Sequence, residues 1–170
     1  MDRIGHPTTT AGVFKLTPRA WPEPRPAHAL GTNFDNTFTL LGYDAHISGS
    51  PSSQNLDIIL YWRCDRRPAA DFTFFVHVID KHSNIVAQID RPPLSGDYPT
   101  SFWAPGEVIQ DRLTVSLPPP GNQGDRGAAS QFWLRIGLYR PEAGTRLPVL
   151  DPAGRPSSDA ATSVDPLVLP

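Results

Sequence analysis

The chain has 170 residues, a formal net charge of −2, 39% hydrophobic residues and a single cysteine, Cys64. This length fits one domain with a hydrophobic core, and the near-neutral charge gives no electrostatic support for a nucleic-acid partner. One cysteine excludes an internal disulfide, and twenty prolines argue against a helical fold because proline removes a backbone donor and clashes inside helices.

The N-terminal part of the chain has the composition of a linker. Four prolines, at positions 18, 22, 24 and 26, fall close together and favour an extended, polyproline-like chain. We therefore expect a proline-rich extension over residues 1–33 and a folded domain over residues 34–170. No signal peptide and no apolar run long enough to cross a membrane is visible, so no membrane span is expected in this chain.

Period-two alternation of side chains predicts strands along the rest of the chain. The runs Phe72–Asp80 and Ile85–Asp90 flank the polar loop Lys81–Asn84, which is typical of a hairpin. The other expected strands are Thr37–Ala45 with a bulge at Gly42, Leu56–Arg63, Val108–Leu117, Gln131–Arg140, Arg146–Leu150 and Ser163–Leu169. Turn signals fall at Ser48–Ser53, Arg66–Ala70, Pro118–Ala129 and Pro152–Ala161. About seven or eight antiparallel strands at this spacing predict an all-β, immunoglobulin- or fibronectin-like β-sandwich with a proline-rich N-terminal extension.

One face of each long strand is apolar and is expected to form the core between the two sheets. The residues on these faces are Leu56, Ile58, Leu60, Trp62, Phe74, Val76, Val78, Leu113, Val115, Phe132, Leu134, Ile136 and Leu138. Before the strand at Val108, the run Trp103-Ala104-Pro105-Gly106 predicts a tight turn, because proline presets φ and glycine permits positive φ at adjacent turn positions. Trp103 is expected to pack back onto the sandwich.

No catalytic or metal-binding pattern is visible. The five histidines are scattered, without an HExxH motif or an acidic calcium loop. Asp44, His46 and Ser48 alternate along one strand, so they point in parallel and do not converge as a hydrolytic triad. Asp111 is expected to cap a turn or a strand end. We therefore expect no enzymatic activity, no catalytic residue, no metal site and no cofactor.

Aromatic residues give the one candidate ligand face. If Thr73–Asp80 and Gln131–Arg140 are neighbouring strands, their outer faces bring five side chains together. These are Phe75, His77, Trp133, Arg135 and Tyr139, with Tyr98 and Trp103 expected at the edge of the face. Flat rings beside Arg and His are what sugar or protein partners use. The alternative is that the N-terminal linker and the segment before Val108 cover this face.

Several stretches of the chain together resemble a known module. They are LLGYD (Leu40–Asp44), LYWR (Leu60–Arg63), FFVHVID (Phe74–Asp80), AQIDRPPLSGDYPTSFWAPGEVIQDR (Ala87–Arg112) and IGLYRPEAGTRLPV (Ile136–Val149). In order and spacing they resemble the C-terminal extracytoplasmic β-sandwich module of bacterial, Chloroflexi-like polytopic membrane glycosyltransferases of the protein-mannosyltransferase type.

The resemblance implies an extracytoplasmic accessory domain of unassigned activity. In that family the catalytic acids belong to the membrane-embedded part, so the resemblance assigns no catalytic residue here. The expected function is a non-catalytic binding module that recognises glycan or glycolipid next to a membrane glycosyltransferase domain. The alternative is a structural or protein-interaction domain, acting as a spacer or in dimerisation, with no small-molecule ligand.

Overall fold

A computed structural model describes residues 23–50, 52–119, 131–164 and 167–168. Residues 1–22 of the predicted linker, and most of the turn predicted over Pro118–Ala129, lie outside the described residues. The main strands are β1 (His28–Phe34), β2 (Phe38–Ser50), β3 (Ser53–Cys64), β4 (Thr73–Ile79), β5 (Ile85–Arg91), β6 (Val108–Ser116) and β7 (Gln131–Arg140). Short elements complete the described chain: the 3-10 turns η1 (Pro93–Gly96) and η2 (Thr100–Phe102), and the strands β8 (Thr145–Arg146), β9 (Val149–Leu150), β10 (Thr162–Ser163) and β11 (Leu167–Val168). None of the helical turns in these residues is long and apolar enough to cross a membrane.

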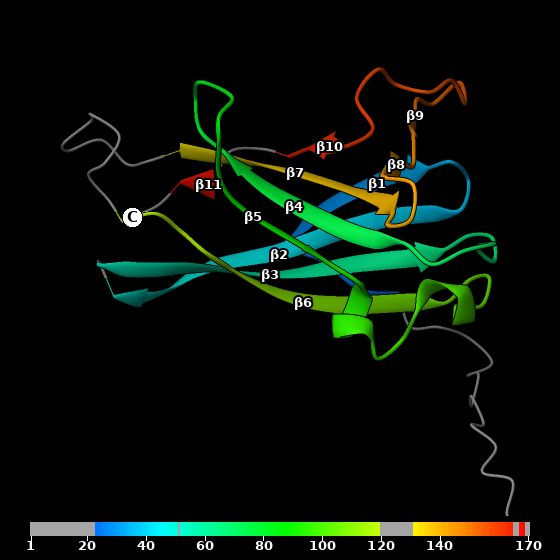
Figure 1. The fold of residues 1–170 in the computed structure, drawn as a ribbon, viewed down its shortest axis with the longest axis horizontal. Helices are drawn as coiled ribbons and strands as arrows, with labels where there is room; N and C mark the ends of the chain where they lie inside the picture. Colours follow the sequence, from blue (N-terminus) through cyan, green and yellow to red (C-terminus); the bar gives the residue numbers. More distant parts are fainter. Residues whose placement is uncertain (1–22, 51, 120–130, 165–166, 169–170) are drawn as a thin grey trace, which may run out of the picture.

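The strands form two antiparallel sheets packed face to face (Figure 1). One sheet has the order β6-β3-β2-β1-β9, and the other has the order β10-β7-β4-β5, with β8 and β11 also paired to β7. The stretch β2-β3-β6 matches strands A-B-E of an immunoglobulin fold, and β10-β7-β4-β5 matches G-F-C with an added C′ strand. The predicted all-β, immunoglobulin-like sandwich is therefore confirmed.

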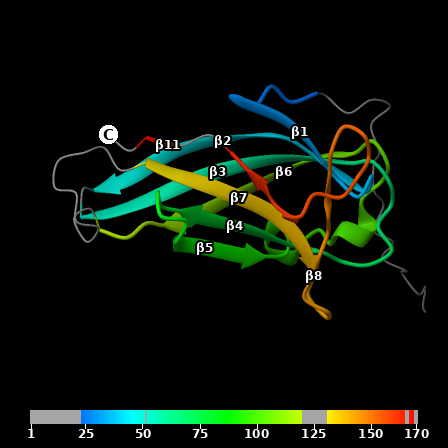
Figure 2. The same cartoon turned by 90° about the horizontal axis from the view of Figure 1, so that it is seen from above.

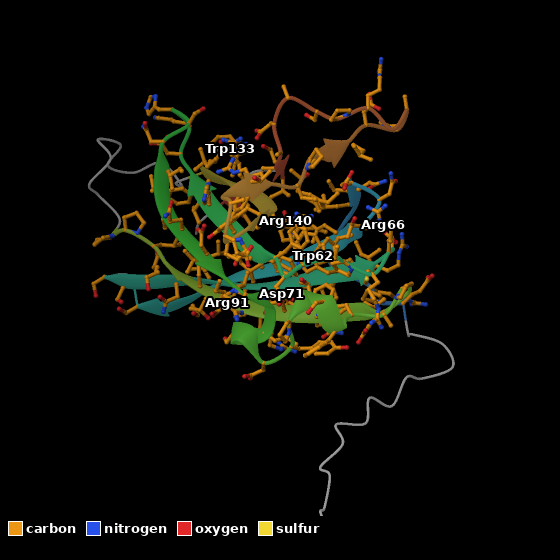
Figure 3. All side chains as sticks on the ribbon, turned by 45° about the vertical axis from the view of Figure 1, so that its right-hand side comes forward. Trp62, Arg66, Asp71, Arg91, Trp133 and Arg140 are labelled. Carbon is orange, nitrogen blue, oxygen red and sulfur yellow. The ribbon has the colours of Figure 1, made fainter. Side chains whose placement is uncertain are left out.

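The core lies between the two sheets and contains every residue that the alternation assigned to it. Its centre is aromatic: the Trp62 ring of β3 stacks on the Phe74 ring of β4 with centroids 4.6 Å apart. Because these two strands belong to different sheets, this contact joins the layers directly. Figure 3 shows Trp62 between the two sheets.

The first strand begins earlier than the domain boundary expected at residue 34. β1 starts at His28 and pairs along β2 as far as Phe34. It contributes only Phe34 to the core, and its other side chains are exposed or partly exposed, so no period-two pattern marked it. The predicted bulge at Gly42 is confirmed by the shift in the β2–β3 register there. A Cβ at Gly42 would lie 2.3 Å from the carbonyl oxygen of His28, so only glycine allows β1 to approach this closely.

Three expected boundaries differ from the structure. The β2–β3 hairpin continues to Ser50 and Ser53, because polar side chains extend the backbone ladder beyond the core and into the predicted turn. The strand expected over Arg146–Leu150 is divided: β8 pairs with β7 in one sheet, and β9 pairs with β1 in the other. The strand expected over Ser163–Leu169 appears as β10 and β11, both on β7.

The segment between β5 and β6 folds into the sandwich. The amide of Glu107 donates to the carbonyl of Ala104 at 3.0 Å and Gly106 has φ of 81°, so the predicted tight turn is confirmed. Trp103 is 0% exposed and makes edge contacts with Phe38 at 5.6 Å and Phe74 at 5.9 Å between ring centroids. Trp103 thus packs onto the sandwich as expected, but inside the core.

Candidate functional site

The pairing of β4 with β7 builds the face on which a ligand site was predicted. His77 lies opposite Arg135, and Ile79 lies opposite Trp133. Because side chains alternate along a strand, these residues face away from the core, together with Phe75 and Tyr139. The expected grouping of Phe75, His77, Trp133, Arg135 and Tyr139 on one outer face is therefore present.

Two of these five residues are not available to a ligand. Phe75 and His77 are both buried, and their rings lie 4.7 Å apart. The guanidinium of Arg146 lies over the Phe75 ring at 4.6 Å, and the ring fills the space left by the missing side chain of Gly137. Phe75 and His77 were expected to contact a ligand, and this expectation is wrong because both are buried. The covering groups come from β8 and from the C-terminal segment.

Burial keeps the His77 imidazole neutral. Burial lowers its pKa below the ordinary value; Asp90, whose oxygen lies 3.9 Å from Nε2, opposes that shift, and Arg146 adds to it. Burial and then Asp90 raise the pKa of the Tyr139 hydroxyl. At neutral pH the imidazole of His77 and the phenol of Tyr139 are therefore both uncharged.

Tyr98 and Trp103, which were expected at the edge of this face, lie elsewhere in the fold. Trp103 is in the core, and Tyr98 stacks against it with ring centroids 6.4 Å apart. The Tyr98 hydroxyl donates to the Glu107 carboxylate at 3.0 Å. The expectation that Tyr98 and Trp103 border the ligand face is wrong, because the Trp103 side chain is buried in the core and Tyr98 packs against it.

Trp133 and Arg135 line a pocket of about 370 Å³ at one end of the outer face. The pocket lies where β7 begins, beside the hairpin loop that joins β4 to β5, and Figure 3 shows Trp133 near that loop. The residues that line it are Ile79, Asp80, Lys81, Ser83, Trp133, Arg135, Asp159 and Ser163. Its volume lies in the range of pockets that bind small ligands.

One wall of the pocket is the hairpin loop, which Asp80 holds in shape. Its Oδ1 accepts the backbone amides of His82 and Asn84, each at 2.8 Å, and its Oδ2 accepts the side-chain amide of Asn84 at 3.0 Å. These hydrogen bonds, with that of the Asn84 side chain foremost, lower the pKa of Asp80. Ser83 has φ of 67°, a left-handed conformation that completes the turn. Asp80 is therefore an ionised carboxylate already occupied by the loop.

The opposite wall combines β7 with the C-terminal segment. Arg135 projects from β7, which is fixed by β4 on one side and by β10, through Ser163, on the other. Its guanidinium forms an ion pair with Asp159, which lies ahead of β10 in the segment that approaches β7 (Figure 2). The side chains of this pair are 32% and 43% exposed. Between the walls lie the Trp133 and Ile79 side chains.

Sequence patterns missed part of this pocket. Lys81 and Ser83 sit in a hairpin loop that was predicted, and the placement of that loop beside the start of β7 follows from the strand order. Ser163 belongs to the strand predicted over Ser163–Leu169, but its position opposite Arg135 depends on the pairing of β10 with β7. Asp159 lies in an irregular segment that no pattern marked. An aromatic surface between charged walls is suited to binding by stacking and hydrogen bonding.

The described residues contain no group of three His, Cys, Asp or Glu side chains able to hold a metal.

The absence of a side chain at Gly137 allows the Phe75 ring and the C-terminal segment to pack closely against β7. A Cβ at this position would lie 2.4 Å from the Phe75 ring and 2.9 Å from the carbonyl oxygen of Ala160. Gly137→Ala is therefore expected to lower the free energy of unfolding by about 1–3 kcal/mol, because the ring or the C-terminal segment must move. Chemical denaturation measures this. An unchanged midpoint would show that the segment does not rest on β7.

No protein-family model matches the sequence. No curated protein matches it either. Among solved structures, a β-glucuronidase from glycoside hydrolase family 2 is 10% identical, with a TM-score of 0.48, over 64% of this chain and 11% of its own. A glycosyl hydrolase family 2 member from Bacteroides cellulosilyticus is 7% identical, with a TM-score of 0.47, over 70% of this chain and 14% of its own. The chain thus spans a small fraction of each, and no activity passes from these hydrolases to it.

Proposed function

We propose that this chain is a non-catalytic accessory module that binds glycan, or the glycan part of a glycolipid, in the pocket that contains Trp133 and Arg135. The observation that carries the proposal is the pocket itself, which places an indole ring beside a guanidinium at the rim of a rigid sheet. Pyranose rings present an apolar face that stacks on aromatic side chains, and their hydroxyls bond to charged groups at the edge.

The surroundings proposed for this module follow from the sequence resemblance. We propose that it acts outside the cytoplasm, next to a bacterial membrane glycosyltransferase domain of the protein-mannosyltransferase type. A rigid sandwich beside such an enzyme would hold an acceptor or product glycan close to the membrane surface. Co-purification of this chain with a glycosyltransferase domain from the same genome tests the association, and its absence from detergent-solubilised complexes would count against it.

Replacing either pocket residue is expected to abolish glycan binding while the fold persists. Trp133→Ala removes the stacking surface and Arg135→Ala removes the charged donor, and neither side chain belongs to the core between the sheets. Wild-type binding of one sugar unit is expected at about 0.1–1 mM, because an open pocket buries little ligand while association carries its full entropic cost. Isothermal titration with a glycan selected on an array measures both variants.

Arg112→Ala is the matched control, because Arg112 is an exposed arginine on β6, in the other sheet. It should leave glycan binding unchanged. Binding that survives both Trp133→Ala and Arg135→Ala would place the ligand elsewhere and contradict the assignment of this pocket.

A spacer or dimerisation domain is the second candidate. β5 is the outermost strand of its sheet, and Ile85 at its start is 49% exposed. Outer strands pair readily with a second chain. If no glycan binds and the protein elutes as a dimer that Ile85→Lys converts to a monomer, this function replaces the first.

A further inference from the structure

The charges that line the pocket identify the class of glycan that fits it. We propose that the ligand carries a carboxylate, as a uronic acid does, and that Asp159 holds the place of that carboxylate on Arg135 in the free protein. The inference rests on the proposed function and deepens it. It makes the Arg135–Asp159 ion pair an internal competitor for the ligand.

The residues that line the pocket include charges of both signs. Lys81 and Arg135 contribute two positive charges to its lining, and Asp80 and Asp159 contribute two negative ones. Asp80 cannot leave, because it organises the hairpin loop through three hydrogen bonds. When Asp159 swings away, the Arg135 guanidinium loses this carboxylate partner, and a ligand carboxylate can take its place.

The two partners of this pair are held very differently. Arg135 lies on β7, which is paired with β4 on one side and with β10 on the other, so its backbone is held in place. Asp159 lies at the end of an exposed irregular stretch, residues 152–158, and its side chain is 43% exposed. Exposed ion pairs are weak, so a ligand carboxylate can replace Asp159 at small cost. The planar guanidinium then offers the ligand the paired donors that carboxylates prefer.

The apolar part of the pocket favours a sugar as the bearer of that carboxylate. Ile79 and Trp133 are directly opposed across β4 and β7 and present adjoining apolar surface. A pyranose stacked on this surface directs the groups at its ring edge toward the walls. A carboxylate at C6 would meet Arg135, and the hydroxyls would meet the loop that carries Ser83. A free carboxylic acid without a ring would lack the stacking contribution.

The test compares three sugars that differ only at C6: galacturonic acid, its methyl ester and galactose. Each is titrated into the full chain while the indole signal of Trp133 is followed by NMR. Galacturonic acid is expected to bind at least about five-fold more tightly than the other two, because only it gains a charge-assisted pair with Arg135. Raising the salt concentration should weaken its binding alone.

Asp159→Asn separates this inference from the proposed function. Removing the competitor should tighten galacturonic acid binding about three- to six-fold, as release of an exposed ion pair allows, and leave galactose unchanged. Asp159→Glu, which keeps the charge, should behave as the wild type and shows that the site is still folded. Equal affinity for all three sugars, with no effect of Asp159→Asn, would overturn the carboxylate inference and leave the glycan-binding function standing. No binding of any sugar, here or on the array, would remove both.

Discussion

Replacing Trp103 by alanine is expected to lower the free energy of unfolding by about 3–5 kcal/mol, because it removes a fully buried indole and leaves a cavity. Trp103 contacts Phe38 of one sheet and Phe74 of the other, and its Nε1 donates to the carbonyl of Tyr98 at 3.2 Å. It therefore anchors the segment between β5 and β6 to both layers. Urea denaturation followed by circular dichroism measures the loss.

Phe102 provides the control in the neighbouring position. Its side chain is 62% exposed, so Phe102→Ala should change the free energy of unfolding by no more than about 0.5 kcal/mol. A small effect of Trp103→Ala, equal to that of Phe102→Ala, would mean that this segment does not fold into the sandwich.

Arg91→Ala is expected to have an effect of similar size, about 3–5 kcal/mol at neutral pH, because it strands a buried carboxylate. Asp111 of β6 is 0% exposed, and its Oδ1 accepts Arg91 at 2.8 Å and the amide of Leu94 at 3.1 Å. Arg91 belongs to β5, so the ion pair joins the outer strands of the two sheets along one side of the sandwich. Asp111 does accept a backbone amide of the turn η1, as a turn-capping carboxylate would, and it is in addition half of a buried ion pair that the sequence did not predict.

The pH dependence identifies Asp111 as the cause. Burial raises the pKa of Asp111 above its ordinary value of 3.8, and Arg91 opposes that rise. The folded protein thus holds this proton more tightly than the unfolded chain, so the contribution of Asp111 is full below pH 3.8 and is lost as pH rises through the folded pKa. Without Arg91 the folded pKa moves higher still. The destabilisation by Arg91→Ala should therefore shrink as the pH is lowered.

Arg155→Ala is the matched control for this second experiment, because it breaks the largely exposed Arg155–Asp151 ion pair. Its effect should stay within about 1 kcal/mol, because exposed ion pairs contribute little. Hydrogen bonds from Arg155 lower the pKa of Asp151, so any pH dependence of this small effect should fall below that of Arg91→Ala on the pH scale. A pH-independent loss in Arg91→Ala would assign the effect to packing of the arginine stem rather than to the charge of Asp111.

The sequence predicted the parts of the fold that repeat a simple pattern. Apolar and polar side chains alternate through Leu56–Arg63 and Gln131–Arg140, and the structure places the apolar ones in the core. The turn at Pro105 and Gly106 was predictable because each residue restricts or permits a specific backbone conformation. These features are local, so they are visible in a window of a few residues.

Features that depend on distant contacts were not predictable in the same way. β1 has too few buried side chains to show a period, and its stability comes from pairing with β2. Trp103 was expected to pack onto the sandwich at the edge of the ligand face, whereas its side chain fills a space in the core between strands far apart in the chain. The burial of Phe75 depends on Gly137 and on the segment near Ala160, which no pattern links to β4. Of the residues predicted for a ligand face, Trp133 and Arg135 line the pocket, and the hairpin loop and Asp159 form its other walls.

The most direct test of glycan binding in the pocket is a glycan titration of the full chain, monitored by the NMR signals of its tryptophan indoles. Trp62 and Trp103 are fully buried, whereas Trp133 lines the pocket. Binding in the pocket should shift the Trp133 signal progressively with ligand concentration and leave those of Trp62 and Trp103 in place. A glycan that binds without moving the Trp133 signal would contradict the assignment of this pocket. The absence of any response across an array of neutral and acidic glycans would contradict glycan binding itself.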